Sequence, residues 1–74
     1  MKRRDPRLIV AANIDKWKRL SDLNDADLYT AAGISRKTFT RRIERLDDSS
    51  FNILELDRMA KCMKCSVSDL VEGV

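Results

Sequence analysis

The residues best suited to bind a metal ion are two cysteines, Cys62 and Cys65, which are separated by two positions. Thiolates at this spacing are common zinc ligands. The 74-residue sequence contains no histidine and no third cysteine, so a zinc site would need Asp, Glu or a second chain to complete it. We therefore predict no metal and no other cofactor, with Cys65 packed as a small hydrophobic residue and Cys62 partly exposed.

Catalysis has no recognisable set of residues in this chain. An enzyme needs a nucleophile or a base positioned in a cleft, and histidine, the most frequent general base, is absent. The serines and carboxylates are scattered without a catalytic pattern. The sequence therefore predicts a protein that is not an enzyme and that has no evident small-molecule ligand.

The basic residues are concentrated in one part of the chain, although the net charge is only +3. Residues 1–45 hold twelve Lys and Arg against six Asp and Glu, whereas residues 46–74 hold three against six. Clustered cations bind polyanions by releasing counterions, so this asymmetry favours a nucleic acid as partner. We find no signal peptide and no membrane-spanning segment, and we interpret the cysteines as reduced thiols. These features predict a cytoplasmic protein without a membrane partner.

The elements that must position these residues are predicted to be helices. Apolar residues recur at spacings of three and four, and the chain has only two Gly and one Pro. Gly33 suits the end of one helix and Ser35 suits the start of the next, which leaves a very short turn between them. We predict helices over residues 7–19 and 25–32, from Ser35 onward, from Asn52 onward, and a last short one after Ser66 or Ser68.

The apolar residues predict one core, because a chain of this length builds a single compact domain. We place that domain at residues 7–74 and a basic arm at residues 1–6. On a helical wheel, Phe39, Ile43 and Leu46 share the inner stripe of their helix. The predicted core contains Trp17, Leu28, Phe39, Ile43, Leu56 and Met59, with Ile53, Ala60 and Met63 on the same stripe as Leu56.

The run from Leu28 to Phe39, LYTAAGISRKTF, resembles the motif L-A-x-x-x-G-I-S-x-x-T-hydrophobic of the Xre-type, lambda-repressor-like family. Ile43-Glu44, residues 53–60 and residues 65–70 resemble the later part of the same family pattern. The resemblance implies an all-α, five-helix domain whose second and third helices form a helix-turn-helix. It also implies sequence-specific DNA binding by a transcriptional regulator, a repressor of bacterial or phage type.

Three features depart from the family pattern. Tyr29 stands where the family usually has alanine, Leu46 stands where glycine often follows the third helix, and the next loop is one residue longer. The wheel also places Ile43, and not Arg42, on the inner stripe of the third helix. We therefore expect an altered register at the back of this helix, with the same residues on its outer face.

The resemblance implies that the third helix enters the major groove of double-stranded DNA at an operator. Arg and Lys can donate to guanine, a Thr methyl can contact the thymine methyl, and Glu can accept from cytosine or pair with a neighbouring Arg. The base-reading candidates are Arg36, Lys37, Thr40, Arg41 and Glu44. The phosphate candidates are Asn24, Ser35, Thr38, Arg42 and Arg45, together with Lys2, Arg3 and Arg4 of the arm.

Two alternatives stay open at this point. The basic residues of the third helix can merely solvate an exposed surface, and a short basic terminus can be disordered without binding anything. The chain can also be a protein-interaction module, such as an antitoxin that binds a toxin and uses DNA binding for autoregulation.

A homodimer is expected because one helix-turn-helix contacts few bases and the related repressors pair two half-sites. Leu54 lies off the inner stripe of its helix, and Val71 and Val74 lie near the end of the sequence, so these three are the candidate dimer contacts. A singly exposed apolar residue without a partner is an equally good interpretation of Leu54. We expect such a dimer to be weak and to form only on DNA.

Overall fold

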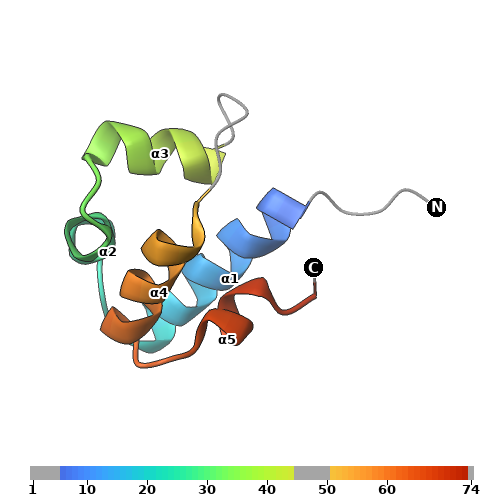
Figure 1. Cartoon of the computed structure of the whole chain (residues 1–74). Coiled ribbons are helices and arrows are strands. Elements are labelled where there is room, and N and C mark those ends of the chain that lie inside the picture. Colours follow the sequence, from blue (N-terminus) through green and yellow to red (C-terminus); the bar gives the residue numbers. More distant parts are fainter. Residues whose placement is uncertain (1–5, 45–50, 74) are drawn as a thin grey trace.

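The computed structural model describes residues 6–44 and 51–73, which form five α-helices and no β-strand (Figure 1). The helices are α1 (Pro6–Leu20), α2 (Asp25–Ala32), α3 (Arg36–Glu44), α4 (Ile53–Cys62) and α5 (Val67–Val71). The all-helical class is thereby confirmed for this part of the chain. The bounds predicted for α2 are the observed ones, and those for α1 differ by one residue at each end.

Polar side chains fix where α2, α4 and α5 begin. Asn24, Asn52 and Ser66 each accept a hydrogen bond from the backbone N–H three residues later. The acidic residue at that later position accepts one in return from the backbone N–H of the cap. This capping box satisfies N–H groups that have no partner within the helix. The three caps were predicted, and the choice between Ser66 and Ser68 falls on Ser66.

The helices pack in pairs around one core. α2 packs against α4, α1 packs against α5, and α3 packs against α2 and α1. Figure 1 shows α3 at one end of the molecule and α5 at the opposite end. Trp17 and Ile43, which were predicted in the core, are half-buried and pack against it. The buried apolar residues of this core are Ile14, Leu28, Ala32, Phe39, Leu56, Met59, Ala60, Met63 and Leu70.

Ile53 does not belong to the core, contrary to the prediction. Its side chain is 70% exposed, although it lies at helical spacing from Leu56 and Ala60. Helical side chains lean toward the N-terminus of their helix, and Ile53 is the first residue of α4. Its side chain therefore extends past the helix end, where the packing against α2 no longer covers it. Leu54 is 55% exposed, as its position off the inner stripe predicted.

Three side-chain hydrogen bonds fasten distant segments to α1 and to the turn after it. Nδ2 of Asn13 donates to the carbonyls of Leu70 at 3.0 Å and Glu72 at 2.9 Å, which ties the end of α5 to α1. Oγ of Ser21 donates to the carbonyl of Met63 at 3.0 Å, at the end of α4. These contacts hold α1, α4 and α5 together, whereas α3 receives none of the three.

Candidate nucleic-acid interface

The turn between α2 and α3 consists of Gly33, Ile34 and Ser35. Gly33 has a φ angle of 75°, in the left-handed region that glycine adopts without steric cost. The N–H groups of Gly33 and Ile34 donate to the carbonyls of Thr30 and Tyr29, respectively. These two bonds form a Schellman motif, which ends α2 and leads directly into α3.

Arg58 of α4 supports this turn from the other side. Its Nη1 donates to the carbonyl of Ala32 at 3.4 Å, and a Cβ atom at position 33 would lie 3.3 Å from the same nitrogen. Glycine is therefore favoured at this position by the φ angle and by the close approach of Arg58. The sequence prediction missed Arg58, because a contact between residues 26 positions apart leaves no local pattern.

Ser35 and Thr38 close the N-terminus of α3. Oγ of Ser35 accepts from the backbone N–H of Thr38 at 3.1 Å and donates to Oγ1 of Thr38 at 3.0 Å. Ser35 is exposed and Thr38 is half-buried. Both phosphate candidates thus lie at a helix N-terminus, where the free N–H groups and the helix dipole attract anions. Their phosphate contacts stay predictions.

Four of the base-reading candidates share the outer side of α3. Arg36, Lys37, Thr40 and Arg41 line one shallow depression of the surface. The three basic residues are exposed, and Thr40 is half-buried. Within residues 6–44 and 51–73, no ion pair engages any of these three cations. Their donors are therefore available to a ligand in solution.

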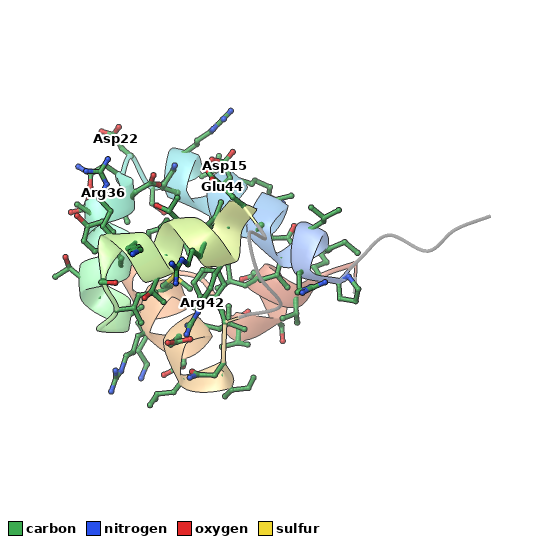
Figure 2. All side chains as sticks on the ribbon, turned by 90° about the horizontal axis from the view of Figure 1, so that it is seen from above. Asp15, Asp22, Arg36, Arg42 and Glu44 are labelled. Atoms are coloured by element: carbon green, nitrogen blue, oxygen red, sulfur yellow. The ribbon has the colours of Figure 1, made fainter. Side chains whose placement is uncertain are left out.

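Carboxylates bound this basic surface at its edges. Glu44 is exposed in the last turn of α3, and Figure 2 shows it at the opposite end of the helix from Arg36. Asp15 and Asp25 line a cavity at the edge of α3, and Nζ of Lys18 bridges them at 3.4 Å and 2.8 Å. The hydrogen bond to Asp25 raises the pKa of Lys18 above its ordinary value. A polyanion is thus attracted to the outer side of α3 and less to its flanks.

The start of α2 is occupied by its own side chains. Oδ1 of Asn24 accepts from the N–H of Asp27, and Oδ2 of Asp27 accepts from the N–H of Asn24, both at 3.0 Å. Asp25 and Asp27 place two carboxylates in this first turn. The cap role of Asn24 is confirmed. Its phosphate contact stays a prediction, and the neighbouring negative charges make this an unfavourable position for a phosphate.

Arg42 does not lie on the exposed side of α3. Its guanidinium forms an ion pair with Glu55 in the first turn of α4, and the two side chains are 19% and 10% exposed. Ile43 turns inward as predicted and packs against the core, but the prediction that Arg42 does not turn inward is wrong. Phe39 lies deepest in α3, and residues three and four positions later flank it on the helical wheel, so both are half-buried. The guanidinium of Arg42 therefore points into the molecule, away from the exposed surface where its phosphate contact was predicted.

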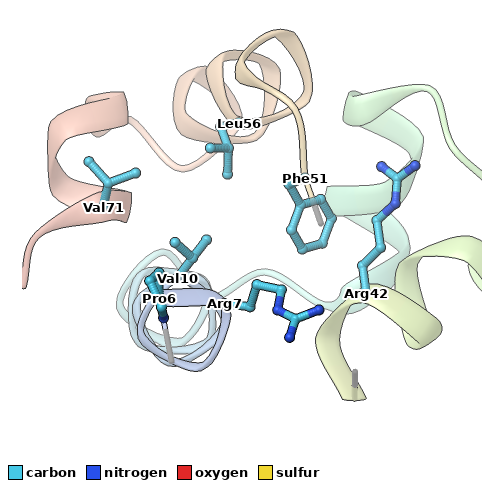
Figure 3. A pocket seen from close by; sticks show the side chains of 7 residues that line it. All are labelled: Pro6, Arg7, Val10, Arg42, Phe51, Leu56 and Val71. Carbon is cyan, nitrogen blue, oxygen red and sulfur yellow. The ribbon is translucent and has the colours of Figure 1, made fainter. Parts of the chain in front are cut away.

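Several predicted residues lie outside the described part of the chain. They are Lys2, Arg3 and Arg4 of the arm, Arg45 and Leu46 after α3, and Val74. Of the other dimer candidates, Leu54 is exposed, whereas Val71 is half-buried. Val71 packs against the core, so part of its surface is already used within the chain, and the rest lines a cavity with Val10 and Leu56 (Figure 3).

The two cysteines are half-buried free thiols. Burial is the main reason why the pKa of Cys65 lies above its ordinary value, so this thiol is protonated at neutral pH. Sγ of Cys62 lies 4.0 Å from the carbonyl of Asp27. In the part of the chain that the structure describes, no group of three or more His, Cys, Asp or Glu is arranged to hold a metal ion.

Comparisons with known proteins add no assignment to this geometry. No family model, no curated protein and no solved structure matches the chain. Among the described helices, none combines the length and the apolar character that crossing a membrane requires. A functional assignment therefore depends on the placement of the basic residues themselves.

Proposed function

We propose that the chain is a sequence-specific DNA-binding protein of the helix-turn-helix type that regulates transcription. In this proposal α2, the turn at Gly33 and α3 form the helix-turn-helix, in an architecture like that of Xre-type, lambda-repressor-like domains. The observation that carries the proposal is the exposed set Arg36, Lys37 and Arg41 on one side of α3, none of which forms an ion pair within the described residues. Three cations on one side of a helix that follows so short a turn favour a major-groove reader.

The chemistry of this surface suits base edges better than a uniform polyanion. Guanidinium groups donate two parallel hydrogen bonds to guanine, and the neighbouring Thr40 offers a methyl group for thymine. Glu44 and the acidic flank repel phosphates that approach from other directions. The favourable approach is therefore the one that brings the outer side of α3 into a groove.

A selection of bound sequences from random duplex DNA tests the proposed function. We expect enrichment of one short motif, repeated with inverted symmetry at a spacing of about one DNA turn. Absence of any enriched motif, together with tight binding to a protein partner, would favour the antitoxin-like alternative.

A second copy of the chain is the proposed partner on DNA. Ile53 and Leu54 are adjacent in the first turn of α4 and are 70% and 55% exposed, so they offer an apolar contact for the same residues of another copy. A stable protein interface buries about 800 Å² per partner, more than two such side chains provide. The proposed dimer is therefore weak in solution and forms when two half-sites bring the copies together.

A further inference from the structure

One carboxylate at the start of α4 serves two partners. Oε1 of Glu55 accepts a hydrogen bond from the backbone N–H of Asn52 at 3.0 Å, and it also pairs with Nη1 of Arg42. The first contact belongs to the capping box of α4, and the second reaches the last turn of α3. The hydrogen bond from Arg42 is the main cause that lowers the pKa of Glu55. Glu55 therefore ties the beginning of one helix to the end of another.

This ion pair is enclosed by protein. The side chains of Arg42 and Glu55 are 19% and 10% exposed. The guanidinium lies 5.8 Å from the ring centre of Phe51, and Figure 3 shows the two side chains next to each other. That ring lies 5.8 Å from the ring of Phe39 in the core. Arg42 is thus held by a carboxylate and by an aromatic ring, and not by solvent.

The contribution of this ion pair to stability does not by itself explain its presence. Nε of Arg42 is buried and has no hydrogen-bond partner within the described residues, and an unsatisfied donor costs free energy. Buried ion pairs add little net stability, because the loss of hydration offsets the attraction between the charges. In some proteins, buried polar groups instead fix the relative position of the elements that carry them, and this is the role to test for Arg42 and Glu55.

The orientation of α3 matters because this helix carries the candidate base-reading residues. It packs on α2 and α1, and its outer side carries the candidate reading residues. Arg41 directly precedes Arg42, so a rotation of the last turn of α3 moves both side chains. A binding site keeps its specificity only when its side chains are held within about 0.5 Å of the productive geometry.

We propose that Arg42 and Glu55 position α3 for base reading, and that Arg42 is not itself a DNA contact. This inference rests on the proposed function, because it concerns the aim of Arg36, Lys37 and Arg41. It replaces the sequence-based expectation of a phosphate contact by Arg42.

The two roles of Arg42 give opposite effects for the variant Glu55→Gln. Glutamine preserves the capping box, because its side-chain oxygen still accepts from Asn52, but it removes the charge that holds the guanidinium. Under the positioning role, affinity for the selected operator falls about tenfold, while affinity for random DNA stays within about twofold. Tighter binding to both DNAs would show a guanidinium released onto phosphates, and would overturn the proposal.

The double variant Arg42→Met with Glu55→Gln separates positioning from stability. It leaves the net charge unchanged, preserves the capping box and replaces the ion pair with an apolar contact, a change that is often neutral or stabilising. We expect an unfolding midpoint at or above that of the wild type, together with an operator-to-random affinity ratio about tenfold lower. An unchanged ratio in this folded variant would overturn the proposal. If the double variant does not fold, Glu55→Gln alone decides.

A matched control is available on the same helix. Asp57 and Lys61 form an exposed ion pair at 3.0 Å, and Asp57→Asn with Lys61→Met also leaves the net charge unchanged. The affinity ratio of this control should stay within about twofold of the wild type, because exposed pairs contribute little. A tenfold loss in the control as well would overturn the specific role of Arg42 and Glu55.

Amide hydrogen exchange of the free proteins gives a readout that does not require DNA. In the double variant, the amides of residues 41–44 should exchange faster than in the wild type and in the control, because the end of α3 opens more often. Unchanged exchange there would overturn the positioning role by itself. A wild-type protein that prefers no DNA sequence would overturn the proposed function instead, so the two failures are distinguishable.

Discussion

α2 and α4 both begin with a capping box, but only the capping box of α4 also contacts another helix. Asn24 and Asn52 both cap a helix, and the acidic residue three positions later returns the hydrogen bond in each case. Asp27 is exposed, whereas Glu55 is buried and also holds Arg42 of α3. The capping box therefore fixes where a helix begins, but the neighbouring helix decides whether its carboxylate also joins two elements.

The largest effect is expected from removing the aromatic ring that packs α3 onto the core. Phe39 is 4% exposed, and its ring centre lies 6.1 Å from that of Tyr29 and 5.8 Å from that of Phe51. Phe39→Ala should lower the free energy of unfolding by about 3–5 kcal/mol, because it removes buried surface and leaves a cavity. Circular dichroism near body temperature should then show a mostly unfolded protein. A variant that melts like the wild type would mean that α3 does not depend on this contact.

The variants Glu55→Ala and Asp27→Ala test the difference between the two capping-box carboxylates. The first leaves Arg42 as a buried charge without a partner, and we expect a loss of about 3 kcal/mol or more in the free energy of unfolding. The second removes only one bond of an exposed capping box, for which about 0.5–1 kcal/mol is expected. Denaturant titration of both variants measures the difference. Equal losses would show that both carboxylates act only as caps.

Acid should weaken the contribution that Glu55 makes to stability. The pKa of Glu55 is lowered in the folded protein, so its contribution to stability is present above the ordinary pKa and is lost as the pH falls. The loss begins below about pH 4.3 and continues down to the lower pKa of the folded state. Glu55→Gln should therefore lose less stability than the wild type as the pH falls below about 4.3. The lowered pKa of Asp69 acts in both proteins and does not affect this difference.

The smallest effect on folding is expected at the exposed residues of α4. Ile53→Ser with Leu54→Ser should change the free energy of unfolding by no more than about 0.5 kcal/mol per site, because both side chains lie at the surface. On operator DNA, sedimentation should detect two wild-type chains per duplex and weaker pairing for the variant. Leu20→Ser is the control, because it removes another exposed apolar side chain, 68% exposed at the end of α1, without a change of charge. One wild-type chain per duplex at saturation would reject the homodimer.

The features that sequence predicted correctly are local ones. Gly33 and the caps Asn24, Ser35 and Asn52 act within a few residues of their own position, so residue type and spacing were sufficient. A helical wheel also predicts which side of a helix faces inward, and it correctly placed Phe39 in the core.

The features that sequence did not predict depend on how the helices lie relative to one another. The pairing of Arg42 with Glu55 and the contact of Arg58 with the end of α2 each join elements that are distant in sequence. A helical wheel gives the direction of a side chain but not the length of helix that its neighbours cover. For that reason it placed Ile53 inside, although the packing ends before that residue.

The central claim is that the outer side of α3 reads DNA bases, and Arg41→Ala tests it most directly. Lys61→Ala is the matched control, because it removes one exposed positive charge from α4. The measurement is the affinity of each protein for the selected operator and for random duplex DNA at one salt concentration. Arg41→Ala should weaken operator binding by about 1–3 kcal/mol and random-DNA binding far less, whereas Lys61→Ala should change the ratio of the two affinities little. Equal losses on both DNAs for Arg41→Ala would contradict base reading by α3.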